Sequence, residues 1–206
     1  MRFSIIIPAY NSEKYIFNAL DHVRSQTFTD YELVVICDSC VDGTQKLAES
    51  YNAKTVAVDF HNDGLSRSKG LDIAQGEYVL FIDDDDWWMR DDLLEFLDNK
   101  IQEDNEPDII CFGFYFKGFG EVKTRRKCMN DLWMATWNKC WKRETIGDTR
   151  FPNVYSVSDM YFHEAMLKKN PRIVEYNECL YYYNYLRPGS ISQKQGNTIE
   201  QTRQWL

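Results

Sequence analysis

The chain has 206 residues, enough for one sizeable hydrophobic core and short for two, so the sequence predicts a single domain over residues 1–206. Its 24 Lys and Arg stand against 32 Asp and Glu, and the net charge of −8 argues against nucleic acid as the main partner. No stretch approaches the roughly 20 apolar residues of a membrane span, and the apolar run 3–7 is too short for a signal peptide. We therefore expect a soluble, cytoplasmic protein.

Apolar runs and helical segments alternate through the first half of the chain. The predicted strands are 3–7, which Pro8 ends, 32–36, 55–58 and 78–82. The predicted helices are 12–23, capped by Asn11 and Ser12, a short helix ending at 48, then 64–74, and one that begins near 91 and ends before Pro107. This alternation is typical of a parallel α/β sheet with right-handed crossovers.

After Pro107 the regular alternation stops. Strands are predicted at 108–116 and 121–127, joined by a turn at Gly118, as a mixed or antiparallel extension. Trp133, Trp137 and Trp141 have helical spacing, which favours a packed core over a ligand platform. A helix at 158–168, two edge-like strands at 172–175 and 179–185, and a polar tail complete the prediction.

Six cysteines are present, and Cys37 and Cys40 form the only C-x-x-C motif. No second pair follows at the spacing of a zinc site. Reduced, partly buried thiols are therefore expected, and a redox-active pair at Cys37 and Cys40 is the less favoured alternative.

Four consecutive aspartates, residues 83–86, directly follow the predicted strand 78–82. In open α/β sheets ligands bind at the carboxyl ends of strands. Crowded carboxylates repel one another and favour a counter-cation, and oxygen ligands suit Mg²⁺ or Mn²⁺, which needs only one or two protein carboxylates when substrate phosphates complete the shell. A solvated acidic turn that caps the helix near Asp91 is the alternative. The position at a strand end favours the metal site.

Over nearly its whole length the chain resembles family 2 glycosyltransferases, enzymes of the GT-A fold that move a sugar from a nucleotide diphosphate. The likeness is closest to bacterial members that build capsular, lipopolysaccharide or cell-wall glycans. The matching segments are SIIIPAYNSEKYI, QTFTDYELVVICDSCVDGT, HNDGLSRSKGLDIAQGEYVLFIDDDDWW, WNKCWKRE, RFPNVYSVSDMYF and LYYYNYLRPGSIS. The resemblance implies a Rossmann-like, mostly parallel sheet, a nucleotide-sugar half at 1–106 and an acceptor half at 107–206. Relatives often continue further, which leaves a C-terminal truncation open.

For the nucleobase, the resemblance implies a pocket lined by Pro8, Ala9 and Tyr10, where a tyrosine ring at a strand end offers a flat stacking face. Asp38 is expected to accept a hydrogen bond from the base. The family usually has two adjacent aspartates here, and Cys37 replaces the first.

For the diphosphate, the resemblance implies that Arg67 pairs with a phosphate at a helix start and that Asn62 reaches the nucleotide. A surface arginine is the alternative for Arg67. Asp83, Asp84 and Asp85 correspond to the family's D-x-D motif. Asp85 is expected to bind the metal directly, and Asp83 and Asp84 to contact the nucleotide sugar, with Asp83 as a further metal contact. The next residue, Asp86, is expected to cap the following helix.

On the acceptor side the family places a Glu-Asp pair whose aspartate is the general base, and here Ser158 precedes Asp159. Asp159 is therefore the expected base, without its usual glutamate neighbour, and an ordinary helix N-cap is the alternative. His163, Arg187 and Ser190 are expected on the acceptor side, with purely structural roles as their alternatives.

The implied reaction is inverting transfer from a UDP-sugar to a glycan or a lipid-linked saccharide, with Mn²⁺ or Mg²⁺ as cofactor and peripheral contact with the cytoplasmic membrane face left open. Asp159 would take the acceptor proton while the charge on the diphosphate is stabilised on the opposite side. Two alternatives stay open. One is a nucleotide-sugar-binding subunit without turnover, suggested by Cys37 and Ser158. The other is a nucleotidyltransferase, although the Gly-rich basic loop of such enzymes is not found at the first strand of this sequence. The preferred assignment requires the aspartate run and Asp159 to face one cleft.

Overall fold

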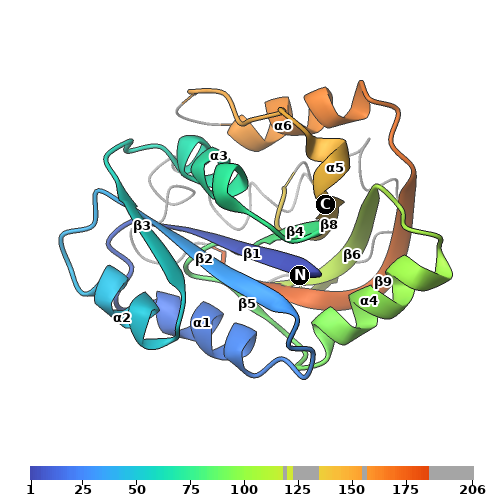
Figure 1. Ribbon diagram of the computed structural model, residues 1–206. Helices are drawn as coiled ribbons and strands as arrows, with labels where there is room; N and C mark the ends of the chain where they lie inside the picture. Colours follow the sequence, from blue (N-terminus) through green and yellow to red (C-terminus); the bar gives the residue numbers. More distant parts are fainter. Residues whose placement is uncertain (118–119, 123–134, 155–156, 186–206) are drawn as a thin grey trace.

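The computed structural model describes residues 1–117, 120–122, 135–154 and 157–185 (Figure 1). Their strands form one mixed sheet in the order β3-β2-β1-β4-β8-β6-β9-β5, with β7 paired to β6. No helix among these residues is long and apolar enough to cross a membrane.

The first half is the parallel part of the sheet. Its strands are β1 (Phe3–Ala9), β2 (Tyr31–Asp38), β3 (Lys54–Val58) and β4 (Tyr78–Phe81). The helices between and after them are α1 (Ile16–Arg24), α2 (Thr44–Ser50), α3 (Asp63–Ile73) and α4 (Leu93–Glu103). β2 and β4 both pair with β1 in parallel register, and β3 pairs with β2 in the same way. The predicted parallel α/β arrangement is confirmed.

The second half continues the sheet with antiparallel and parallel pairs. It contains β5 (Trp87–Trp88), β6 (Ile109–Phe116), β7 (Gly120–Val122), β8 (Lys139–Lys142), β9 (Ile173–Tyr183), α5 (Arg143–Ile146) and α6 (Ser158–Leu167). β8 is antiparallel to both β4 and β6, whereas β9 is parallel to β6. The predicted mixed extension is therefore present.

Helices cover both faces of the sheet (Figure 1). The apolar side chains of α1, α2 and α4 share one core cluster with one face, and those of α3, α5 and α6 share a second cluster with the other. The cores form because alternate residues of the buried strands point to opposite faces, so Ile5 lies in the first cluster and Ile6 in the second. The result is a three-layer molecule with α3 and α6 on the same face.

Two predicted boundaries in the first half are wrong. β1 continues through Pro8 to Ala9, and α1 begins at Ile16 rather than at 12. The carbonyl of Ile6 accepts the backbone N–H of Ile82, so the backbone groups of Ile6 point towards β4. Those of Pro8, two residues later, point in the same direction but lie beyond the last residue of β4. Its missing N–H therefore costs no ladder hydrogen bond.

Two predictions in the second half are also wrong. Trp137 and Trp141 are buried as predicted, but Trp141 lies in strand β8 and not in a helix; Trp133 lies outside the described residues. The segments 172–175 and 179–185 fall largely in one strand, β9, which pairs with β6 along its length and with β5 at Tyr181 and Tyr182, so the second segment is not at an edge. A bulge near Gly113 in the β6–β9 pairing lets this strand run through. The turn at Gly118 and most of the strand at 121–127 lie outside the described residues.

Candidate active site

The aspartate run 83–86 lies at the C-terminal end of β4, as predicted. The backbone N–H of Tyr10, just after β1, donates to Oδ2 of Asp84 over 3.2 Å. The run is therefore next to the end of β1, on the edge where the parallel strands finish and open α/β sheets bind ligands.

The prediction that Asp86 caps the next helix is wrong. Its side chain is fully buried, and α4 has Asp92 at its N-cap position, without a side-chain capping hydrogen bond. Burial, with the charges of Asp85 and Asp83, raises the pKa of Asp86 well above its ordinary value. The run is therefore not a solvated acidic turn at the start of α4.

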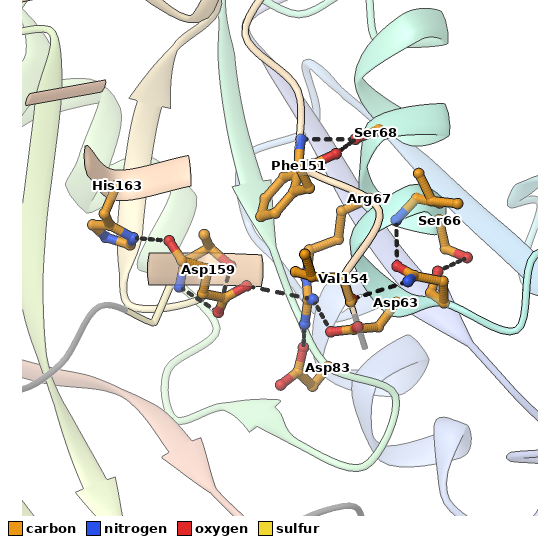
Figure 2. Close-up of polar contacts among 12 residues, drawn as sticks. Asp63, Ser66, Arg67, Ser68, Asp83, Phe151, Val154, Asp159 and His163 are labelled. Carbon is orange, nitrogen blue, oxygen red and sulfur yellow. Dashed lines mark hydrogen bonds and ion pairs between the residues drawn. The ribbon is translucent and has the colours of Figure 1, made fainter. Parts of the chain in front are cut away.

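Arg67 of α3 lies between the aspartate run and Asp159 (Figure 2). Its Nη2 is 2.6 Å from Oδ1 of Asp83, and its Nη1 is 2.5 Å from Oδ2 of Asp63 and 3.5 Å from Oδ1 of Asp159. The Arg67 side chain is only 5% exposed, so it is not a surface arginine. Three carboxylates from α3, α6 and the end of β4 surround one buried guanidinium. Its predicted pairing with a phosphate stays a prediction.

Asp159 is held by a residue that the sequence did not single out. The backbone N–H and the hydroxyl of Thr136 donate to Oδ2 of Asp159 over 3.3 and 3.4 Å, whereas the buried Oδ1 faces Arg67 without a hydrogen bond. The N-cap of α6 is Val157, with no side-chain capping bond, so the capping alternative for Asp159 is wrong. Burial raises the pKa of Asp159, and the charge of Arg67 opposes that shift.

The starts of α3 and α6 meet through small residues. A Cβ atom on Gly64 would lie 2.9 Å from Cβ of the buried Ser158, closer than real Cβ contacts come, so only glycine allows this approach. The loop before α6 is tied to α3 as well, because the N–H of Phe151 donates to the hydroxyl of Ser68 over 2.9 Å (Figure 2). This contact brings Asp159 to Arg67.

Asn62 has a structural task that the sequence analysis missed. Its Oδ1 caps α3 by accepting from the N–H of Leu65, and its Nδ2 donates to the carbonyl of Val154 over 3.0 Å. Nδ2 also donates to Oδ1 of Asn153. Both ends of the amide are used within the protein, which argues against the predicted contact with a nucleotide.

At the predicted nucleobase pocket, Tyr10 alone of its three residues is exposed. Pro8 and Ala9 are buried in β1, whereas the Tyr10 side chain is 54% exposed and meets the ring of His61 edge-on, with centroids 6.2 Å apart. An accessible ring at this edge is suited to stacking on a base.

Asp38 is buried and already accepts several hydrogen bonds. The backbone N–H groups of Phe60, His61 and Asn62 donate to it over 2.7 to 2.9 Å, and the hydroxyls of Ser39 and Ser66 donate as well. Burial acts to raise the pKa of Asp38, but the backbone donors outweigh it and the pKa is lowered. Asp38 thus shapes the loop before α3. Its predicted contact with a base stays a prediction, and little acceptor capacity remains for it.

The five described cysteines are free thiols, as expected, while Cys128 lies outside the described residues. Cys37 is buried, and the half-buried Cys40 donates from Sγ to the carbonyl of Ala9 over 3.3 Å. The hydrogen bond with Cys37 lowers the pKa of Cys40 to about 7.

His163 has a structural role in α6. It is fully buried, its Nδ1 donates to the carbonyl of Asp159 over 2.8 Å, and burial with the charge of Lys139 lowers its pKa to about 3. The neutral, enclosed imidazole supports the first turn of α6, and its acceptor-side role stays a prediction. Arg187 and Ser190 lie outside the described residues.

Comparison with known proteins gives the family. Residues 4–169 match the model of Glycosyl transferase family 2. Poly(ribitol-phosphate) beta-N-acetylglucosaminyltransferase TarS of Staphylococcus aureus is 37% identical over 211 residues, an alignment that covers 92% of this chain and 36% of TarS. Glycosyltransferase GlyA of Streptococcus pneumoniae is 27% identical over 222 residues, covering 93% of this chain and 32% of GlyA. The chain thus spans about a third of each relative.

Comparison with solved structures gives the same family as the sequence comparison. The crystal structure of S. aureus TarS 1–349 in complex with UDP-GlcNAc matches with a TM-score of 0.81 and 26% identity, over 92% of this chain and 60% of that one. The mixed sheet with helices on both faces is that of the GT-A fold. The chain therefore belongs to glycosyl transferase family 2.

Proposed function

We propose that this chain is an inverting glycosyltransferase that moves a sugar from a UDP-sugar to a hydroxyl of a glycan or lipid-linked saccharide. One observation carries the proposal: Arg67 contacts both Asp83, at the end of β4, and Asp159, at the start of α6. The two carboxylate sites therefore face one position. That TarS is named an N-acetylglucosaminyltransferase and was crystallised with UDP-GlcNAc supports a UDP-sugar as donor.

Asp159 is the general base in this proposal. Inverting transfer needs a carboxylate that removes the proton of the acceptor hydroxyl as it attacks the anomeric carbon opposite the diphosphate. Thr136 donates to one oxygen of Asp159, and the charge of Arg67 opposes the rise in the pKa of Asp159 that burial causes. Ser158 is buried against Gly64, so Asp159 works without a second carboxylate beside it.

A divalent cation fits the donor chemistry of the aspartate run. Among the described residues no three His, Cys, Asp or Glu side chains are grouped as a complete metal cage. Mg²⁺ and Mn²⁺ do not need one, since one or two carboxylates and the substrate phosphates suffice. Asp85 is the proposed direct ligand because the family resemblance places the metal there, with Asp84 beside it in the turn; Asp83 is paired with Arg67. Such a cation would neutralise charge on the departing diphosphate.

The test uses purified protein, UDP-GlcNAc and other UDP-sugars, with Mn²⁺, Mg²⁺ or EDTA. We expect UDP binding that depends on the cation, and slow donor hydrolysis that Asp159→Asn abolishes without loss of UDP binding. Cation-dependent binding with no turnover on any acceptor would favour the binding subunit. Pyrophosphate release from UTP and a sugar phosphate would favour the nucleotidyltransferase.

A further inference from the structure

Residues at the end of β9 and just after it form hydrogen bonds with the aspartate run. The buried carboxylate of Asp86 accepts the hydroxyl of Tyr181 at Oδ2 and the backbone N–H of Asn184 at Oδ1, both over 2.7 Å. The Asp86 side chain thus points into the protein.

The same tyrosine also holds the first aspartate of the run. The hydroxyl oxygen of Tyr181 accepts the backbone N–H of Asp83 over 3.1 Å while its proton goes to Asp86. Nδ2 of Asn184 donates to the carbonyl of Asp85 over 3.2 Å. Two side-chain hydrogen bonds therefore hold the backbone at the two ends of the Asp83 to Asp85 turn.

Tyr181 is itself rigidly placed. It is fully buried and stacks on Trp137 with ring centroids 4.5 Å apart and planes 14° apart. Its backbone pairs with Trp88 of β5 on one side and Phe114 of β6 on the other. A hydroxyl on such a ring has little freedom, so Tyr181 gives the turn a fixed point of attachment to the sheet, in addition to the turn's own bond from the N–H of Asp86 to the carbonyl of Asp83.

We infer that Tyr181 and Asp86 are positioning residues for the cation and diphosphate site, and that the fourth aspartate exists to anchor the turn rather than to bind a ligand. The inference rests on the proposed function. Carboxylate ligands need outer hydrogen-bond partners to hold their geometry, and loss of such a partner typically costs about 10–100-fold in metal affinity. Without the anchor, the turn would keep the bond from Tyr10 to Asp84 and the bond from the N–H of Asp86 to the carbonyl of Asp83, but would lose its attachment to β9.

Tyr181→Phe removes one oxygen and leaves the ring stack intact. The matched control is Tyr182→Phe, because Tyr182 is the next residue of β9 and its ring stacks on Trp87, 4.1 Å away. The dissociation constant of Mn²⁺ is measured with UDP present, by calorimetry and by the electron paramagnetic resonance of free Mn²⁺, and the melting temperature is measured in EDTA.

We expect Tyr181→Phe to weaken Mn²⁺ binding about tenfold or more and Tyr182→Phe to leave it unchanged. Asn184→Ala removes only the side-chain bond to the Asp85 carbonyl and should weaken Mn²⁺ binding by a smaller factor. It replaces Tyr181→Phe as the test variant if Tyr181→Phe does not fold. Equal Mn²⁺ affinity in wild type, Tyr181→Phe and Asn184→Ala would overturn the inference while leaving the proposed function intact. A wild type that binds neither Mn²⁺ nor UDP would overturn the proposed function as well.

Discussion

Arg67 and Asp159 come from helices far apart in the chain, yet Nη1 of the arginine lies 3.5 Å from Oδ1 of the aspartate. The same guanidinium holds Asp83 at 2.6 Å. The buried guanidinium of Arg67 therefore sets the relative position of the proposed base and the aspartate run. Replacing Arg67 should affect both stability and catalysis.

Arg67→Met should lower the free energy of unfolding by about 3 kcal/mol, the low end for a buried pair, because it leaves three half-buried carboxylates without the guanidinium that pairs with them. It should also move the acidic limb of the pH–activity profile to higher pH, since Arg67 opposes the raised pKa of Asp159. Arg150→Met is the control, because the exposed pair of Arg150 with Asp72 is worth about 0–1 kcal/mol. Urea unfolding and a pH–rate series measure both effects. Equal losses in the two variants would contradict the role of Arg67.

Asp159→Asn should reduce transfer by a factor of about 10²–10⁴, the usual contribution of a general base. It should also stabilise the protein at neutral pH. The folded pKa of Asp159 is raised above its ordinary 3.8, so the unfolded chain loses its proton first and wild type loses stability as pH rises through that window. The stability gain of the variant should therefore be absent in acid and full at pH 7, by urea unfolding at each pH. A gain that does not depend on pH would contradict the assignment.

Gly64→Ala should reduce turnover more than its effect on stability explains. The new Cβ would lie 2.9 Å from Cβ of Ser158 and push α6, with Asp159, away from Arg67, at a cost of about 1–3 kcal/mol. Gly70→Ala is the control, because its Cβ would press on Ile6 in the core instead. We expect kcat per folded molecule to fall only for Gly64→Ala. Adding Ser158→Gly to this variant should restore part of the lost kcat. Equal kcat in both alanine variants would be the contrary result.

His163 should make the protein sensitive to acid. Its folded pKa of about 3 lies below the ordinary 6.5, so its contribution to stability is complete above about pH 6.5 and is lost as pH falls, by about 1.4 kcal/mol per pH unit. His163→Gln should flatten the fall between pH 6.5 and 4 in urea unfolding. His61→Gln, the same substitution at a side chain that is 66% exposed, is the control.

Among the five cysteines that the structure describes, Cys40 should be the first to be alkylated at neutral pH. Its pKa of about 7 makes half of it thiolate there, whereas Cys37 is buried and its pKa is raised. Iodoacetamide labelling followed by peptide mass analysis should find Cys40, with a rate that rises through pH 7. Bound UDP should slow it if the base lies beside Tyr10. Labelling that is distributed evenly over the cysteines would contradict this environment.

The sequence determined the local elements that short-range patterns encode. The apolar run before Asp83 could only be a buried strand, and the helical spacing of Leu93, Leu94, Leu97 and Ile101 fixed the buried face of α4. A polar run directly after a strand of a parallel sheet must lie at its carboxyl edge, so the place of the candidate site followed as well. The family resemblance then supplied Asp159.

Only the tertiary structure decided what these side chains contact. Trp141 has helical spacing with its neighbours but lies in β8, because pairing with β4 and β6 outweighs local periodicity. Asn62 and His163 were predicted to contact a ligand and Asp86 to cap a helix, yet each side chain makes hydrogen bonds inside the protein. No sequence pattern pointed to the contacts of Thr136 and Tyr181. Hydrogen bonds across the fold depend on where distant segments meet, and periodicity along the chain does not contain that information.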